Sequence, residues 1–317
     1  MWILLGVIAG LAVLLLGILL WSFHMAFYAD REPSHEEYPI PVGEIYEPYR
    51  DKMVKWIKDV RQMPCEEFSV TSHDGLTLRG KYYCYSPDAP IELMFPGYRG
   101  EAERDLCGGV QRCFKLGHSA LIVDQRACGK SDGHVISFGV NESKDCMTWL
   151  SFMQKHFLDS KIILTGISMG AATVMLAAGQ PLPENVVGVL ADCGYSSAKA
   201  IICKCAKDMK LPPKLVYPFI RLGAIVFGNF DPESDSPVEA AKRCQKPVIF
   251  FHGDADDFVP CHMTWEVYDA CAAPKRMVII RGAGHGLSYI IDPETYLREM
   301  EDFYRSTAAK TTTEETL

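Results

Sequence analysis

A Gly-x-Ser-x-Gly pattern at residues 166–170 separates two segments with different local preferences, and it constrains the fold more than any other feature. Residues 161–164 are mostly apolar, as in a buried parallel strand, whereas residues 171–178 are small and apolar, as in a helix. A serine between such elements occupies a tight turn that directs its hydroxyl out of the sheet. Gly166 and Gly170 have no Cβ, so the strand and the helix can approach closely around Ser168.

A serine hydroxyl becomes a strong nucleophile only when a neighbouring base accepts its proton. His285 is the best candidate, because glycines flank it and an apolar strand at residues 276–281 precedes it. The other downstream histidines are less suitably placed. His252 directly follows an apolar strand and is expected to pack at its end, and His262 begins the next predicted helix.

The base requires an acid, and three aspartates follow the predicted strand at residues 247–251. The spacing Gly-x-x-Asp-x-x-Val-Pro selects Asp256, whereas Asp254 or Asp257 is expected to bond backbone amides in the turn. Asp192 is a second candidate, since it follows the preceding predicted strand, at residues 186–191. The order serine, acid, histidine along the chain fits either aspartate, and the spacing favours Asp256.

Acyl transfer also requires two donors for the oxyanion that forms on the substrate. One is expected to be the backbone amide of Met169, the residue after the serine. The other is expected in the loop that follows the apolar run at residues 91–95, and we assign it to the backbone amide of Tyr98. Both donors belong to the backbone, so the Tyr98 side chain is not part of this prediction.

These motifs resemble the α/β-hydrolase superfamily, and most closely its bacterial membrane-anchored members with a serine aminopeptidase or monoglyceride-lipase-like domain. The resemblance covers residues 65–306 and includes Phe95–Tyr98, Asp124–Gly133, the serine turn and the loops of Asp256 and His285. It implies an α/β-hydrolase fold with a cap inserted after strand six, at about residues 196–243. The family usually has His-Gly in place of Pro96-Gly97, and Arg-Gly-x-Gly-x-Ser where this chain has alanine at 127.

The order of predicted elements agrees with that fold. From residue 91 onward strands and helices alternate, which predicts a mostly parallel sheet with helices on both faces. A hairpin at Asp74-Gly75 precedes them, and residues 44–62 form an amphipathic helix that lies on a bilayer or, as we favour, packs on the hydrolase domain. The predicted domains are an anchor (1–23), a linker with the juxtamembrane helix (24–64), the hydrolase domain (65–306) and a disordered polar tail (307–317).

Residues 1–23 carry no charged side chain and are long enough to cross ~30 Å of hydrocarbon. A cleavable signal peptide would have a basic start and a shorter apolar region, so we predict a single membrane anchor, with an unusual signal peptide as the alternative. The flanks hold too few basic residues to predict which side of the membrane the domain occupies.

Composition and net charge limit the kinds of partner that this protein is expected to bind. The net charge is −8 and no basic run occurs, so the sequence gives no sign of nucleic-acid binding. The 12 cysteines form no Cys-x-x-Cys pair and no zinc spacing, which favours buried thiols or a reducing setting. A serine mechanism requires neither a cofactor nor a metal, and none is expected.

The sequence therefore predicts a membrane-anchored serine hydrolase that cleaves carboxylic esters, with a small-molecule ester or lipid as substrate. Two alternatives stay open. An aminopeptidase would use acidic groups to bind a substrate amine, and the cap offers Asp208, Asp231, Glu233 and Asp235. A protein of the same fold could instead bind a ligand without turnover.

Overall fold

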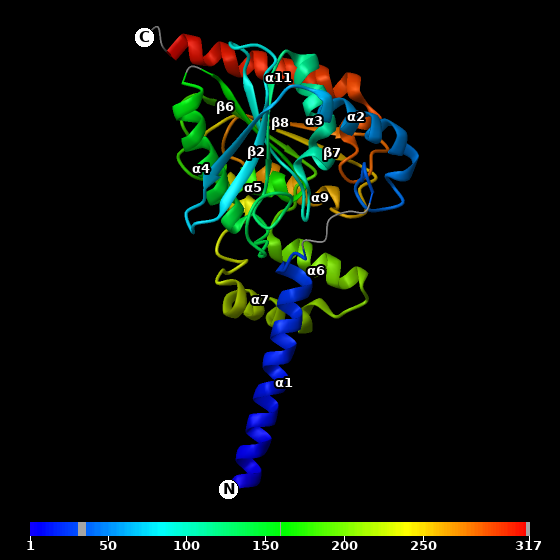
Figure 1. Ribbon diagram of the computed structural model, residues 1–317, viewed down its shortest axis with the longest axis vertical. Coiled ribbons are helices and arrows are strands. Elements are labelled where there is room, and N and C mark those ends of the chain that lie inside the picture. Colours follow the sequence, from blue (N-terminus) through cyan, green and yellow to red (C-terminus); the bar gives the residue numbers. More distant parts are fainter. Residues whose placement is uncertain (31–35, 159, 315–317) are drawn as a thin grey trace.

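Eight strands form one sheet in the part of the chain that the computed structural model describes, residues 1–30, 36–158 and 160–314 (Figure 1). The strands lie in the order β1-β2-β4-β3-β5-β6-β7-β8. β1 and β2 are antiparallel, β2 is antiparallel to β4, and the remaining neighbours are parallel. The predicted α/β-hydrolase fold with a mostly parallel sheet is thus confirmed. The strands are β1 (Glu66–Thr71), β2 (Thr77–Tyr83), β3 (Ile91–Phe95), β4 (Ser119–Asp124), β5 (Ile162–Ile167), β6 (Val186–Asp192), β7 (Val248–Gly253) and β8 (Lys275–Ile280).

Helices cover both faces of this sheet because alternate strand residues are apolar on both sides. In β3, for example, Leu93 packs with the helices of one face and Met94 with those of the other. The first face carries α4 (Val140–His156), α5 (Met169–Ala178) and α9 (Cys261–Ala270). The second carries α2 (Arg50–Gln62), which follows a short 3-10 helix (Glu47–Tyr49), α3 (Ala102–Leu116) and α11 (Pro293–Glu314). The amphipathic helix α2 therefore packs on the hydrolase domain, as favoured above.

One polar cluster lies inside the core on the second face. Glu92 of β3 is fully buried, and its carboxylate accepts hydrogen bonds from Arg112 and, at 2.9 Å, from Thr165. Burial alone would raise the pKa of Glu92, but the positive charge of Arg112, together with hydrogen bonds from His118 and Thr165, outweighs it and lowers that pKa to about 2. The core thus holds a negative and a positive charge, and each offsets the cost of burying the other.

We expect Glu92→Gln to lower the free energy of unfolding by about 3–5 kcal/mol, because it leaves Arg112 buried without a counter-charge. Urea unfolding of the full-length protein in detergent measures this loss. Since the folded-state pKa of Glu92 lies below the ordinary 4.5, the carboxylate stabilises the fold above pH 4.5 and loses that effect as the pH falls toward 2. The variant should therefore also lose part of the acid sensitivity of unfolding.

The matched control removes both charges. A Glu92→Leu, Arg112→Met double variant should lose less stability than Glu92→Gln, because no unpaired charge remains in the core. An equal or larger loss in the double variant would contradict the role assigned to the ion pair.

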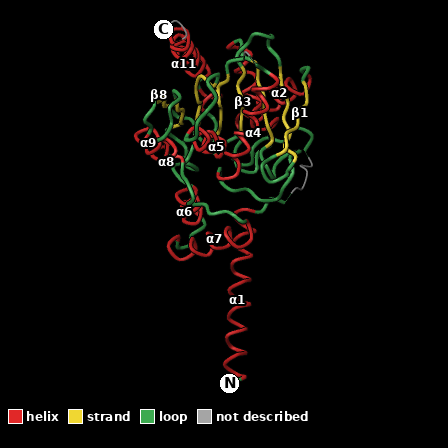
Figure 2. The backbone as a smooth tube through the Cα atoms, turned by 90° about the vertical axis from the view of Figure 1, so that its left-hand side faces the viewer, coloured by secondary structure: helices red, strands yellow, loops and turns green. Residues whose placement is uncertain are grey.

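The cap, residues 196–243, is inserted between β6 and β7, as predicted. It contains α6 (Ala198–Asp208), α7 (Pro213–Gly228) and the short helix α8 (Pro237–Ala241). Figures 1 and 2 show α6 and α7 at the end of the hydrolase domain from which the N-terminal helix α1 (Trp2–Phe27) projects, beside the C-terminal end of that helix. The cap therefore lies where the two parts of the molecule meet.

Helix α1 projects away from the domain, and most of its side chains are exposed (Figure 2). Within the described residues it is the one helix long and apolar enough to cross a membrane, a test that some signal sequences also pass. It continues to Phe27, whereas the sequence placed the linker from residue 24 onward. The reason is tertiary, because Phe23 and Phe27 pack against aromatic residues of the cap.

The C-terminal prediction also needs correction. Residues 307–314, expected to be disordered, continue α11, which runs from Pro293 to Glu314. No glycine or proline follows Pro293 within this helix, so nothing in its sequence interrupts the backbone hydrogen bonds. Residues 315–317 of the predicted tail, and residues 31–35 of the predicted linker, lie outside the described residues.

Candidate active site

Ser168 lies in the turn between β5 and α5 with backbone angles φ 57° and ψ −116°, a conformation that non-glycine residues rarely adopt. The glycines on either side make the turn possible. A Cβ on Gly166 would lie 2.1 Å from the carbonyl oxygen of Gly170, and a Cβ on Gly170 would lie 2.0 Å from that of Phe95. The close approach predicted from the Gly-x-Ser-x-Gly spacing is therefore present.

Three side chains predicted from distant parts of the sequence meet at this turn. The Nε2 atom of His285 lies 2.9 Å from the Ser168 hydroxyl, and its Nδ1 atom lies 2.7 Å from a carboxylate oxygen of Asp256. All three residues are buried. The imidazole thus bridges the hydroxyl and the carboxylate, with one ring nitrogen directed at each.

Asp256 is held in place by its own turn after β7. Its second carboxylate oxygen accepts hydrogen bonds from the amides of Phe258 and Val259, at 2.9 and 2.8 Å. Burial alone would raise the pKa of Asp256, but hydrogen bonds from His252 and His285 outweigh it and bring that pKa well below its ordinary value. The Asp256 carboxylate is therefore ionised at neutral pH and gives the imidazole a negatively charged partner.

The other acidic candidates have different partners. Asp254 accepts a hydrogen bond from the Gly282 amide at 2.6 Å, so it bonds a backbone amide as predicted, but one in the loop after β8 and not in its own turn. Asp192 is buried, and its two oxygens accept hydrogen bonds from Ser288, at 3.1 Å, and Tyr296, at 3.0 Å. Burial raises the pKa of Asp192. The geometry therefore favours Asp256 as the partner of the imidazole.

The remaining histidines of this region do not reach the serine turn through any described bond. His252 packs at the end of β7, where its ring nitrogens lie 2.7 Å from the Thr264 hydroxyl and 2.8 Å from the Val259 carbonyl oxygen. His262 lies in the first turn of α9. These positions match the structural roles that the sequence predicted.

The loop at residues 96–100, named here the oxyanion loop, lies beside the serine. A Cβ on Gly97 would stand 3.5 Å from the Ser168 Cβ and 3.8 Å from its hydroxyl oxygen. Tyr98, the predicted second donor, is the next residue. Met169 is the first residue of α5, where a backbone amide has no acceptor within its own helix. Both predicted donors thus lie in backbone adjacent to the nucleophile.

The segment after β4 supports the oxyanion loop, a role that the sequence analysis did not assign. The side chain of Gln125 donates to the Pro96 carbonyl oxygen at 2.7 Å and accepts from the Thr173 hydroxyl at 3.1 Å. Gln125 thereby connects the loop to α5. Only its place within the Asp124–Gly133 motif could have indicated it. Ala127 in the same motif has φ 63°, the left-handed conformation that explains the glycine usual at this position in the family.

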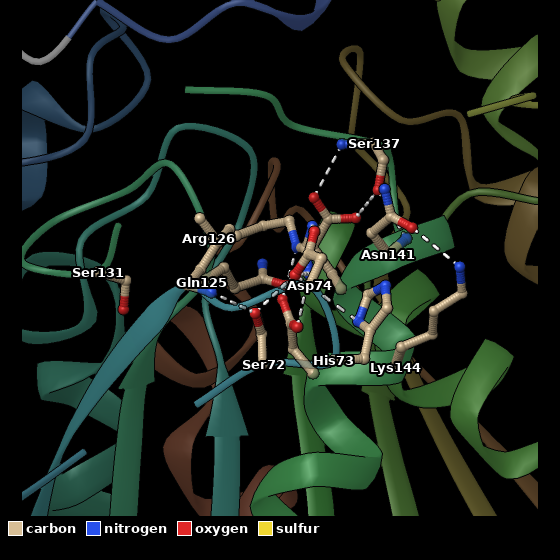
Figure 3. Close-up of polar contacts among 12 residues, drawn as sticks. Ser72, His73, Asp74, Gln125, Arg126, Ser131, Ser137, Asn141 and Lys144 are labelled. Atoms are coloured by element: carbon tan, nitrogen blue, oxygen red, sulfur yellow. Dashed lines mark hydrogen bonds and ion pairs between the residues drawn. The ribbon is translucent and has the colours of Figure 1, made fainter. Parts of the chain in front are cut away.

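Arg126, the residue beside Gln125, connects the same turn to other segments through its guanidinium, which lies close to Asp74 (Figure 3). Its guanidinium donates two hydrogen bonds of 2.7 Å to Asp145 of α4, and bonds of 2.9 and 3.1 Å to Asp74. Ligand atoms of His73, Asp74 and Asp145 lie within 4.8 Å of one another, a spacing that suits a metal. Because the guanidinium already donates hydrogen bonds to both carboxylates, we interpret the cluster as an ion-pair network.

A second group with metal-like spacing overlaps the serine site and includes Cys193, Asp256 and His285. The last two are hydrogen-bonded to each other. Burial raises the pKa of the Cys193 thiol well above its ordinary value, which disfavours the thiolate that a metal would bind. These residues therefore fit an acid–base pair better than a metal centre.

Two cavities meet at Ser168. One, of about 390 Å³, is named here the apolar cavity and extends between α1 and the cap. The other, of about 610 Å³, extends toward α2 and α3 and is named the mixed cavity, since charged residues such as Arg104 and Asp105 lie on its wall. Tyr98, Arg99 and Phe258 border both cavities together with the serine. A bound molecule can thus extend from the hydroxyl in two chemically different directions.

The acidic residues of the cap line neither cavity. They form ion pairs with neighbouring basic groups of the cap: Asp208 with Lys204, Asp231 and Glu233 with Arg221, and Asp235 with Arg243. They consequently offer no binding site for a substrate amine near Ser168.

Comparisons with known proteins agree with this architecture. A family model described as alpha/beta hydrolase fold matches residues 93–214. An uncharacterised protein of Bacillus subtilis, YqkD, is 27% identical over 59% of this chain and 62% of its own length. The mitochondrial palmitoyl-protein thioesterase ABHD10 of Rattus norvegicus is 26% identical over 61% of this chain and 67% of its own. The esterase Pf2001 of Pyrococcus furiosus superposes with a TM-score of 0.65 at 19% identity, covering 84% of this chain and 96% of that one.

The sheet order, the serine turn and the family match agree on one architecture. The chain has the α/β-hydrolase fold, and over residues 93–214 its sequence matches the family model of that fold.

Proposed function

We propose that this protein is a membrane-anchored serine hydrolase that cleaves carboxylic esters through an acyl-enzyme. The observation that carries the proposal is the continuous path of hydrogen bonds from Asp256 through His285 to Ser168, at 2.7 and 2.9 Å. Asp256 keeps a proton on Nδ1 of the imidazole and leaves Nε2 free to accept one. The nucleophile, the base and the group that orients the base are then all in reach of one another.

In the first half-reaction Nε2 of His285 takes the hydroxyl proton while the Ser168 oxygen attacks the ester carbonyl carbon. The backbone amides of Tyr98 and Met169 stabilise the negative charge on the former carbonyl oxygen. The bond to the leaving alkoxide then breaks, and the alkoxide receives the proton from His285. The products are a free alcohol and an acyl-serine.

In the second half-reaction water replaces the alcohol. His285 takes a proton from the water as it attacks the acyl carbonyl, and the same two amides again stabilise the oxyanion. The bond to the Ser168 oxygen breaks, the serine recovers its proton from His285, and a carboxylic acid leaves. Each step requires only the side chains and backbone amides of this protein, the ester and water.

The membrane anchor rests on α1. Its 26 residues rise about 39 Å, more than the ~30 Å thickness of a bilayer core. It carries no Asp, Glu, Lys or Arg. These two properties support a single span, and the hydrolase domain would lie at its C-terminal end.

Relative rates on two substrate classes test the proposal. We expect the full-length protein in detergent to hydrolyse p-nitrophenyl acyl esters, and to hydrolyse aminoacyl p-nitroanilides at least about 100-fold more slowly, because the described acids of the cap are paired and lie away from Ser168. The measurement is kcat/KM for each class. A preference for the anilides would establish the aminopeptidase alternative. Folded protein that neither turns over esters nor reacts with a fluorophosphonate would indicate a binding role.

A further inference from the structure

The apolar cavity is built from three parts of the chain that are distant in sequence. The hydrolase domain contributes residues around Ser168, such as Phe138 and Val259, and the cap contributes residues of α6 and α7. The third wall comes from α1. Its cavity-facing residues are Ile18, Trp21, Ser22, Met25 and Ala26. Their spacing places them on one face of the helix.

The end of α1 is attached directly to the oxyanion loop. The Tyr98 hydroxyl donates to the Ala26 carbonyl oxygen at 2.9 Å, and the Arg99 guanidinium donates to that of Tyr28 at 2.7 Å. The Phe27 carbonyl oxygen accepts from the Ile136 amide at 2.8 Å. Carbonyl groups that a helix end leaves without partners are thus satisfied by the hydrolase domain. This fixes the position of α1 relative to Ser168.

The crossing of α1 and α7 places the cap near the membrane boundary. The helices approach closely at Gly223, where a Cβ would lie 2.7 Å from the Leu19 carbonyl oxygen. From Trp2 to Leu19 the helix rises about 26 Å, close to the ~30 Å of a bilayer core. At this level α7 exposes a stripe of apolar side chains, Leu215, Leu222 and Val226 among them. The occupant that fits this stripe is the bilayer, because α1 continues into it.

The apolar cavity opens at the same level. Trp21 of α1 and Met209 beside α6 both line it, and they are 59% and 57% exposed. These residues mark its mouth, between α1 and the connection of α6 to α7. Exposed lysines lie on and beside this connection at residues 207, 210 and 214, where anionic lipid headgroups would meet them.

We propose that α1 is a wall of the acyl-binding site as well as an anchor, and that long acyl chains of membrane lipid esters enter the apolar cavity from the bilayer. This inference rests on the proposed function. The ester carbonyl lies at Ser168, the acyl chain lies between α1 and the cap, and the alcohol part of the lipid occupies the mixed cavity with its charged wall. The acyl chain passes from the apolar interior of the bilayer into the apolar cavity, so little of its apolar surface is exposed to water on the way.

A pair of tryptophan variants tests the wall. Ser22 is 6% exposed and faces the cavity, whereas Leu20, in the same turn of α1, is 51% exposed and does not line it. In full-length protein in lipid nanodiscs, Ser22→Trp should reduce kcat/KM for p-nitrophenyl palmitate at least about tenfold and leave that for p-nitrophenyl butyrate within about twofold. Leu20→Trp should change neither. An unchanged palmitate-to-butyrate ratio in Ser22→Trp would overturn the proposal.

Two further measurements keep the test decisive. If Ser22→Trp also loses butyrate hydrolysis, Ser22→Leu makes a smaller change at the same site, and the same ratio decides. If the wild-type protein hydrolyses neither ester, the proposed function fails, and the wall is judged by the binding of parinaric acid, a fluorescent long-chain fatty acid. Weaker binding in Ser22→Trp alone would support the wall, and equal binding in both variants would refute it.

Discussion

Ser168→Ala is expected to lower kcat for ester hydrolysis by about 10⁶-fold, because it removes the atom that forms the acyl-enzyme. The backbone angles at residue 168 are open to alanine as much as to serine, and the change removes only one oxygen, so the fold should persist. The measurement is kcat on p-nitrophenyl butyrate, together with covalent labelling by a fluorophosphonate. Both signals should disappear in the variant.

Ser143→Ala is the matched control. Ser143 is also buried, but its hydroxyl donates to the Val140 carbonyl oxygen within α4. It should keep both the activity and the label. Residual turnover in Ser168→Ala above about one part in 10³ would mean that another group or a bound water acts as the nucleophile.

Asp256→Asn is expected to lower kcat by about 10⁴-fold in protein that still folds. An asparagine keeps the shape of the side chain but supplies no negative charge to the imidazolium that forms during attack. It also favours the imidazole tautomer whose proton faces Ser168. Kinetics on the butyrate ester measure the loss, and fluorophosphonate labelling should slow in parallel.

The control for this prediction is the other buried acid of the region. Asp192→Asn should cost less than about tenfold in kcat, because the Asp192 carboxylate bonds Ser288 and Tyr296 and no bond to His285 is described. If Asp192→Asn proved the more damaging change for kcat of correctly folded protein, the assignment of the acid would be reversed.

Features governed by local spacing could be predicted from the sequence. The glycines at 166 and 170 permit one type of turn, and the apolar strands before Asp256 and His285 end at the same edge of a parallel sheet as the strand before Ser168. Parallel strand direction therefore places the three side chains at one edge of the sheet, whereas the loops after the strands bring them into contact. The family resemblance predicted that residues 196–243 form a cap. The amino-acid pattern alone indicated only that this segment is too long for a simple connection between two strands.

Contacts between distant segments could not be predicted in this way. Nothing around Glu92 indicates that a residue of α3 will neutralise it, and nothing in residues 18–26 distinguishes a helix face that lines a cavity from one that faces lipid. The length of α1 was underestimated for the same reason, since Phe27 is helical because of its packing with Phe230 and Phe138. Contacts of this kind produce no periodic pattern and no local motif in the sequence.

The aromatic packing of Phe27 has a practical consequence. A fragment that lacks residues 1–27 would lose Phe23 and Phe27 from a cluster that includes Tyr217 and Phe230. The fragment would expose the remaining rings of this cluster to solvent and lack one wall of the apolar cavity beside Ser168. Screens run on such a fragment would describe a different specificity from that of the intact molecule.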